Sequence, residues 1–403
     1  MGTPHRFCDV RNLTETLAEP LGPEDQTVQS MADVSPTKWH RAHVTWFFEE
    51  FVLGPTIESY GVFHPQYSYL FNSYYEAVGP RHPRARRGAV SRPTVDDVTA
   101  YRRAVDVAMI DMLDAGVDDE VAALVELGLH HEQQHQELLL MDAKHVLSQS
   151  VLDPVYRKGG APNPHDDRPV GWIEHDGGLV EIGAEEHAFA YDNELPRHRV
   201  HLEPFALADR PVTCGEWLEF IDDGGYERPE LWLSDGWAEV CAGTFDAPMY
   251  WRDDGDWSVF TLHGRVPLDP QEPVCHVSYY EADAFAQWAG ARLPTEAEWE
   301  VVASQYTDGP DFDTERLHPV AAGPEPEFFG RVWEWTSSSY SPYPGFRPGP
   351  GAIGEYNGKF MVGQQVLRGG CCATPPGHIR STYRNFFPPP ARWAFSGLRL
   401  ARD

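Results

Sequence analysis

Lysine is scarce in this chain of 403 residues: only four of its 32 basic residues are lysines, and 62 residues are acidic. The formal net charge is -30 at pH 7. A surface this acidic repels phosphate backbones and anionic lipid headgroups, so we expect neither nucleic acid nor a membrane as a partner. The charge is no evidence for a cationic substrate, because surface carboxylates commonly serve solubility.

Cysteine is also sparse, and long apolar runs are missing. The six cysteines include no Cys-x-x-Cys pair, which excludes a dense disulfide framework and favours a reducing, cytoplasmic location. Cys371 and Cys372 are adjacent and are expected to be buried thiols, since a disulfide between neighbours is strained. No window approaches the roughly 18 apolar residues of a membrane span, and Met1–Pro20 has no apolar core, so neither a span nor a signal peptide is expected.

The chain is long enough for two packed domains, and its N-terminal part has helical periodicity. Ser35-Pro36 predicts the start of a helix that continues to about residue 53. Thr94 is expected to cap a second helix, and a third is expected over residues 118–148. With a short helix before residue 31, these segments predict a four-helix bundle.

The composition changes after the helical region. Residues 158–169 are rich in Gly, Pro and Asp, which predicts a linker. Short alternating segments then predict strands, and residues 213–222 and 278–289 predict helices. We therefore expect an α+β chain. The predicted boundaries are 1–155 for a helical domain, 156–172 for a linker and 173–403 for a second domain.

The most informative motif is a pair of histidines in the segment 118–148. His131 and His135 are four residues apart, so on a helix both rings lie on one face and can bind one metal ion. They share this face with Leu124 and Leu138. An inner, apolar face is an unusual place for two solvated histidines, which favours a metal site.

A third histidine is available on the first long predicted helix. His43 shares its stripe with three large aromatic side chains, although a histidine in the core would do the same. His40 and His130 compete for this role. His43 is preferred for its aromatic stripe, and His131 because it, unlike His130, pairs with His135 at the i+4 spacing. Three histidines leave coordination positions open for chemistry.

The same segment, His131-Glu132-Gln133-Gln134-His135, also has the HExxH pattern of zinc peptidases. In that interpretation the metal is zinc and Glu132 is the general base. No third ligand typical of such enzymes follows in the sequence. A zinc hydrolase and a non-catalytic binding module both stay open at this point.

Two further groups of residues are candidates for substrate chemistry. Tyr74 and Tyr75 lie between the first two long helices, where a phenol either packs locally or donates a proton beside a metal. Arg84, Arg86 and Arg87 follow in the same connection. They either balance surface charge or bind a substrate carboxylate with forked donors.

Longer motifs resemble those of the ergothioneine-biosynthetic sulfoxide synthases, the hercynine oxygenase family of non-haem iron enzymes. The matching segments are 35–49, 71–75, 131–138, 189–194, 292–300 and 332–336. The resemblance covers nearly the whole chain. It implies a DinB-like bundle followed by a formylglycine-generating-enzyme-like domain, which has a C-type-lectin-like fold.

The resemblance also implies the reaction. Members of this family bind Fe(II) by three histidines, and the matching positions are His43, His131 and His135. The HExxH pattern is then coincidental, and Glu132 is no general base. The family uses O2 to join the sulfur of a thiol to C2 of the imidazole of Nα-trimethylhistidine (hercynine), and the product is a sulfoxide. The implied partners are small-molecule substrates.

The remaining site residues follow from the same resemblance. Gln134, Asn385 and Phe387 match positions that contact the histidine derivative. An amide and an aromatic ring suit an imidazole and a quaternary ammonium group, although core packing alone would also explain Asn385 and Phe387. Arg84 and Arg87 are the expected partners of the carboxylate of the thiol substrate. The site is expected between the domains.

The tyrosine pair indicates the sulfur donor. Tyr74 and Tyr75 match a pair typical of the branch that accepts free cysteine, in which a phenol supplies a proton and steers oxidation away from cysteine dioxygenation. The mycobacterial branch uses γ-glutamylcysteine and has its tyrosine in the second domain, and its local pattern is not evident in this sequence. We therefore expect cysteine. A selenium donor, as in selenoneine synthesis, stays an alternative.

Overall fold

The computed structural model describes residues 3–159, 168–185, 189–306, 312–349 and 352–403. These residues form two compact units, and each is described by itself. The first unit is Met1–Arg157 with Pro350–Tyr356, and the second is Lys158–Gly349 with Asn357–Asp403. Residues 160–167, the middle of the predicted linker over 156–172, lie outside the described residues.

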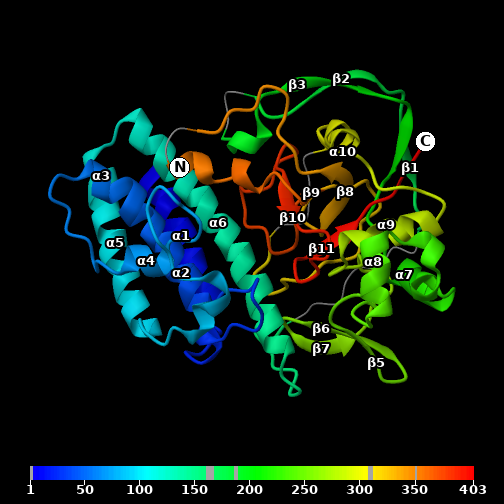
Figure 1. The fold of residues 1–403 in the computed structure, drawn as a ribbon, viewed down its shortest axis with the longest axis horizontal. Coiled ribbons are helices and arrows are strands. Elements are labelled where there is room, and N and C mark those ends of the chain that lie inside the picture. Colours follow the sequence, from blue (N-terminus) through cyan, green and yellow to red (C-terminus); the bar gives the residue numbers. More distant parts are fainter. Residues whose placement is uncertain (1–2, 160–167, 186–188, 307–311, 350–351) are drawn as a thin grey trace. The chain divides into compact units, whose positions relative to one another are not determined.

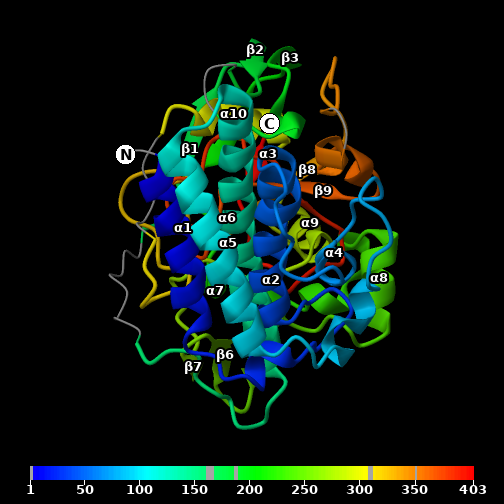
Figure 2. The same cartoon turned by 90° about the vertical axis from the view of Figure 1, so that its left-hand side faces the viewer.

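The first unit is a four-helix bundle, so the predicted fold of this part is confirmed (Figure 1). Figure 2 shows its four long helices alongside one another. They are α1 (Thr3–Ala18), α2 (Thr37–Phe48), α5 (Val95–Ala115) and α6 (Asp119–Ser148). A π-helical turn over Glu49–Leu53 and α3 (Gly54–Thr56) prolong α2, and α4 (Tyr67–Phe71) lies in the connection to α5.

Two of these helices, α5 and α6, begin at side chains that cap them. Thr94 forms a capping box at the start of α5, and the carboxylate of Asp118 caps α6, because both side chains accept hydrogen bonds from exposed backbone N–H groups. Ser35-Pro36 predicts Ser35 as the N-cap and Pro36 as the first helical residue of the first long helix, and this prediction is wrong. α2 begins at Thr37 with Pro36 as its N-cap, and the hydroxyl of Ser35 accepts a hydrogen bond from an arginine instead.

A buried carboxylate ties three of the four helices together. Glu132 on α6 is fully buried and accepts hydrogen bonds from Arg11 on α1 at 2.8 Å, from Arg102 on α5 at 3.0 Å and from Thr14 at 2.6 Å. Burial by itself raises the pKa of Glu132, but the charges of the two arginines outweigh burial and lower the pKa below its usual value. The ionised carboxylate is therefore a structural anchor of the bundle.

The second unit has short helices and strands, as expected for the α+β class. The helices predicted over 213–222 and 278–289 are confirmed as α7 and α9, each with a capping box at its start. The helices of this unit are α7 (Cys214–Asp222), α8 (Ser234–Cys241), α9 (Tyr279–Trp288) and α10 (Glu296–Ala303).

The strands described in the second unit form four small sheets. The largest has the order β10-β9-β8-β11, in which β11 runs parallel to β8 and the other pairs are antiparallel. Its strands are β8 (Trp333–Ser339), β9 (Gln365–Arg368), β10 (Asn385–Phe387) and β11 (Ser396–Leu398). The other sheets are β1 (Trp172–His175) with β4 (Phe205–Ala208) and β12 (Ala401–Arg402), β2 (Gly178–Ile182) with β3 (His198–Leu202), and β5 (Trp251–Asp253) with β6 (Trp257–Thr261) and β7 (Gly264–Pro267).

Helix α10 fills the core between these sheets. Its Trp299 is fully buried and donates to the carboxylate of Glu334 on β8 at 2.6 Å. Arg399 binds the same carboxylate with two nitrogens, at 2.8 and 2.9 Å. This paired arrangement satisfies a charge that would otherwise be costly to bury.

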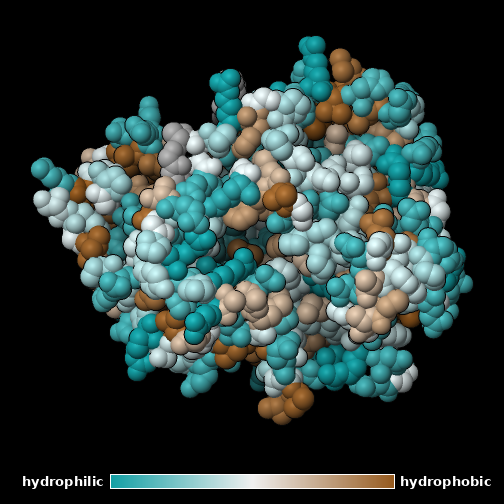
Figure 3. Space-filling model, viewed as in Figure 1, coloured by the Kyte–Doolittle hydropathy of each residue, from teal (hydrophilic) through white to brown (hydrophobic). Residues whose placement is uncertain are grey.

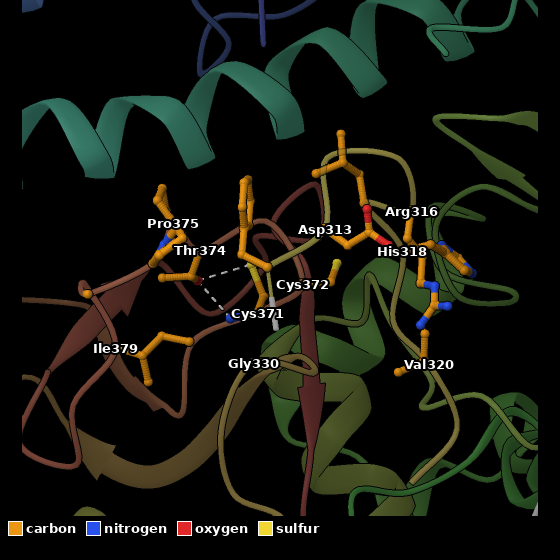
Figure 4. A pocket seen from close by; sticks show the side chains of 14 residues that line it. Asp313, Arg316, His318, Val320, Gly330, Cys371, Cys372, Thr374, Pro375 and Ile379 are labelled. Carbon is orange, nitrogen blue, oxygen red and sulfur yellow. Dashed lines mark hydrogen bonds between the residues drawn. The ribbon is translucent and has the colours of Figure 1, made fainter. Parts of the chain in front are cut away.

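The adjacent cysteines line a cavity of about 420 Å³ in the second unit (Figure 4). Cys371 is buried, and its backbone N–H donates to the hydroxyl of Thr374 at 2.8 Å. Cys372 is half-buried, so the expectation of two buried thiols is right for Cys371 and wrong for Cys372. All six cysteines are free thiols.

Hydrophilic side chains cover most of the face shown in Figure 3, in keeping with the acidic composition. Among the described residues, no helix combines the length and the apolarity needed to cross a bilayer.

The anchoring role of Glu132 gives a stability prediction. Glu132→Gln removes the fully buried counter-charge that Arg11 and Arg102 share and leaves them with the partly exposed carboxylates of Asp106 and Glu15. The free energy of unfolding should therefore fall by about 3 kcal/mol in denaturant titrations. Glu126→Gln on the same helix is the control. It removes a partly exposed ion pair with Arg6 and should cost less than about 1 kcal/mol. Equal losses for the two variants would contradict the anchoring role.

Candidate metal centre

Three histidines converge in the interior of the bundle. His43 comes from α2, and His131 and His135 come from successive turns of α6. One ring nitrogen from each histidine lies within 4.8 Å of the other two. His43 and His131 are buried, and His135 is half-buried. The i+4 spacing places two rings on one face of α6, and the packing of α2 against α6 adds the third.

The hydrogen bonds of the rings show which nitrogens point inward. His43 donates from Nδ1 to the carbonyl oxygen of Phe71 at 2.6 Å, which leaves the lone pair on its Nε2. This Nε2 lies 3.1 Å from Nε2 of His131. Nδ1 of His131 is buried and has no hydrogen-bond partner among the described residues. Two imidazole nitrogens therefore lie close together, and at least one of them carries a lone pair. A cation shared by both nitrogens would stabilise this arrangement.

The environment keeps the three imidazoles neutral. Burial lowers the pKa of His131 to about 3, although the neighbouring Glu132 raises it. Burial, followed by the repulsion between the rings, lowers the pKa values of His43 and His135 well below the usual value. Only neutral imidazole donates a lone pair to a metal ion, so the site is ready for binding near neutral pH. A set of three neutral nitrogens suits a divalent transition metal.

Aromatic side chains fix the orientation of these rings. Trp39 stacks on His43 with ring centroids 4.6 Å apart and an interplanar angle of 12°. The ring centroid of Trp46 lies 5.6 Å from that of His43, and the ring centroid of Phe47 lies 4.8 Å from that of His131. We call Trp39, Trp46 and Phe47 the aromatic wall. It limits rotation of the ligand rings and excludes water from one side of the site.

The competing histidines do not join this group. His130 contacts Arg6 and Glu126 instead. His40 lies behind His135 and contacts it through Nδ1. Glu132 is also outside the group, because both of its carboxylate oxygens are held by buried donors. A residue so engaged cannot serve as the general base of a zinc hydrolase, which removes the main argument for that alternative.

The two predicted tyrosines lie beside the aromatic wall. Tyr75 is fully buried, and its ring is 5.8 Å from Trp46. Tyr74 is half-buried and stacks on Tyr75 with centroids 4.6 Å apart. The side chain of Asn72 shapes this turn, because it accepts from the Tyr75 backbone N–H and donates to the Tyr75 carbonyl oxygen, both at 2.9 Å.

A third tyrosine, which sequence reasoning missed, reaches the same region. Tyr356 belongs to the short segment that packs with the first unit, and its hydroxyl donates to the side-chain oxygen of Gln134. Its ring lies 5.7 Å from the His131 ring and 6.4 Å from Tyr74. The preceding Glu355 holds this segment, because its carboxylate accepts two backbone N–H groups at 2.9 Å.

The predicted arginines separate in the structure. Arg87 is buried, and its guanidinium lies 3.3 Å from the centroid of the Trp39 ring. Arg84 is exposed and donates to the backbone oxygen of Asp33. Arg87 is therefore the arginine that is linked to the aromatic wall, whereas Arg84 is engaged at the surface.

Comparisons with known proteins assign the chain to a family. The DinB superfamily model matches residues 6–139, and the sulfatase-modifying factor enzyme 1-like domain matches residues 162–325 and 326–403. Hercynine oxygenase of Mycolicibacterium smegmatis is 34% identical over 92% of this chain and 91% of its own length. That of Mycolicibacterium thermoresistibile is 33% identical over 100% of this chain and 96% of its own. This chain belongs to the hercynine oxygenase family.

Membership of the hercynine oxygenase family makes the protein an oxygen-using oxidoreductase and confirms the resemblance drawn from the motifs. The helical region of this family member is the DinB part, and the second region is the sulfatase-modifying-factor part. Ergothioneine biosynthesis protein 1 of Schizosaccharomyces pombe is a partial relative, 31% identical over 53% of this chain and 28% of its own length.

The last two predicted residues lie in the second unit. Asn385 and Phe387 are both on β10, an edge strand of the four-stranded sheet, and both are half-buried. Arg384, immediately before them, is buried and binds Glu296 with two nitrogens at 2.8 and 2.9 Å. This ion pair fixes the strand on which Asn385 and Phe387 are presented.

Proposed function

We propose that the protein is an ergothioneine sulfoxide synthase that uses Fe(II) and O2 to join the sulfur of cysteine to C2 of the hercynine imidazole. The observation that carries this proposal is the convergence of His43, His131 and His135 in a neutral, buried environment. The relatives named hercynine oxygenase support the choice of hercynine as the imidazole substrate.

His43, His131 and His135 would hold the iron. When bound, the iron would supply a redox-active centre with open positions for the thiol and O2. The protein contributes neutral imidazoles of fixed orientation and an aromatic wall that keeps water away. Glu132 does not compete for the ion, because its charge is satisfied by Arg11 and Arg102.

Arg87 is our candidate for binding the carboxylate of the thiol substrate. It donates to the hydroxyls of Ser35 and Ser73, at 2.8 and 3.2 Å, and its Nε is buried without a hydrogen-bond partner. Among the described residues, no carboxylate lies within ion-pair distance of this guanidinium. Burial, and then the charge of Arg84, lowers the pKa of Arg87 well below the usual value. A bound anion would supply the counter-charge that this buried guanidinium lacks.

Hercynine would be held by an amide and by aromatic rings. Gln134 accepts a hydrogen bond from Tyr356, which fixes the direction of its side-chain amide and aims its NH2 group as a donor. Asn385 and Phe387 keep the roles that the resemblance gives them, namely a polar partner for the imidazole and an aromatic face for the trimethylammonium group.

A phenol would hold the proton that directs the reaction. Tyr74, Tyr75 and Tyr356 form one contiguous aromatic group beside His131. A proton delivered from a phenol during O2 reduction favours C–S bond formation over oxidation of the thiol to a sulfinate.

Arg84 has a weaker case than Arg87 as a substrate residue, since its guanidinium is already engaged with Asp33.

The proposed reaction requires that both organic substrates be present. Protein loaded anaerobically with Fe(II) should consume O2 with hercynine and cysteine together, and only slowly with cysteine alone, as followed with an oxygen electrode. Mass spectrometry should identify the cysteine-derived sulfoxide when cysteine, γ-glutamylcysteine and a selenium donor compete. Equal oxygen uptake with cysteine alone would indicate a thiol dioxygenase. A product from γ-glutamylcysteine or selenium would overturn the assignment of the donor.

The three tyrosines can be separated by single substitutions. Tyr74→Phe, Tyr75→Phe and Tyr356→Phe each remove one hydroxyl and keep the ring packing. Loss of the acting phenol should lower the ratio of sulfoxide to cysteine sulfinate by about 10²-fold or more, as measured by chromatography of the products. Tyr69→Phe, on an exposed tyrosine of α4, is the control. An unchanged ratio in all three variants would exclude a phenol as the proton donor.

A further inference from the structure

A second buried histidine lies directly behind the histidine group. His40 is on α2, close to one turn before His43, and only 3% of it is exposed. Its Nδ1 is 2.9 Å from Nδ1 of His135. Its Nε2 is 2.9 Å from the carboxylate of Asp142, which lies two turns after His135 on α6 and is equally buried. The three side chains form a continuous chain of hydrogen bonds that leads away from the metal centre.

This chain fixes the position of each proton. The carboxylate of Asp142 accepts, so Nε2 of His40 carries the hydrogen. With its hydrogen on Nε2, His40 presents the lone pair of Nδ1 to His135 and accepts from it. His135 consequently carries its hydrogen on Nδ1, which leaves the lone pair on Nε2, the nitrogen available for the metal. The carboxylate of Asp142 thus sets the tautomer of His135, a proposed iron ligand, through two successive hydrogen bonds.

The other two histidines of the group are supported differently. His43 donates to a neutral backbone carbonyl, that of Phe71, and Nδ1 of His131 has no partner among the described residues. Only His135 is connected to a negative charge by this route among the described residues. Asp142 is itself held in place, because it accepts from the backbone N–H of Ser35 at 2.8 Å.

We propose that His40 and Asp142 are positioning residues that orient His135 and increase the electron density on its metal-binding nitrogen. The proposal rests on the iron site of the proposed function. A carboxylate linked through an imidazole makes the ligand a stronger donor and stabilises the more highly charged state of the metal. In this protein one of the three ligands therefore differs from the other two, although all three are histidines.

The test compares variants of the chain of hydrogen bonds with a matched histidine. Asp142→Asn keeps an acceptor for Ser35 and removes the charge, and His40→Gln interrupts the chain. His130→Gln is the control, because His130 is also buried on α6 but pairs with Arg6 and Glu126. Fe(II) affinity is measured anaerobically by competition with a chromophoric chelator. The midpoint potential of the bound iron is measured by spectroelectrochemistry, and folding by circular dichroism.

Both Asp142→Asn and His40→Gln should weaken Fe(II) binding by about 10- to 100-fold and raise the midpoint potential of the bound iron. The Fe(II) affinity of the double variant should be little lower than that of the weaker-binding single variant, because Asp142 acts on His135 through His40. His130→Gln should bind Fe(II) like the wild type. Wild-type potential and affinity in a folded Asp142→Asn variant would overturn the inference alone. A wild-type protein with no affinity for Fe(II) would overturn the proposed function as well.

Discussion

The packing of α2 against α6 is the constraint on which the rest of this structure depends. It brings the ring of His43 to the two rings that α6 presents at i and i+4, and it places His40 against His135. The packing is maintained from the far side of α6 by Glu132, which is held by arginines from α1 and α5. One of these arginines, Arg11, also donates to Thr45 on α2 at 2.9 Å. The ion network around Glu132 and the histidine group therefore both depend on the packing of α2 against α6.

The two faces of α6 differ in the charge of their buried groups. Around Glu132 the bundle buries full charges and balances them, so the carboxylate stays ionised. Around His131 the buried groups are imidazoles, and burial keeps them neutral. Neutral histidines cost less to bury than ions, but they leave lone pairs that face one another. A bound cation removes this repulsion, so metal binding and stability of the bundle are expected to be coupled.

Much of the first unit could be predicted because its signals are local. Helix periodicity, the cap at Thr94, and the i+4 histidine pair all depend on residues within one or two turns. The choice of His43 over His40 depended on one aromatic stripe. In the structure His43 belongs to the histidine group, and His40 contacts His135 from behind. Glu132 could not be interpreted from spacing alone, since its partners on α1 and α5 are distant in the sequence.

Tyr356 and Arg87 show where sequence reasoning ended. Tyr356 lies more than two hundred residues from Gln134, in a segment rich in glycine and proline, and no periodicity connects the two. Three arginines in one short stretch looked equivalent in the sequence, but a 3₁₀ turn over Arg84–Ala89 buries Arg87 and leaves Arg84 and Arg86 exposed. Such differences arise from tertiary packing, which local patterns do not encode.

The most direct test of this account is anomalous diffraction at the iron edge from crystals of the Fe(II)-loaded protein. The account predicts a single iron peak within coordination distance of one nitrogen each from His43, His131 and His135, with the remaining positions free of protein ligands. Iron bound elsewhere, or a fourth side chain that completes the coordination shell, would contradict it.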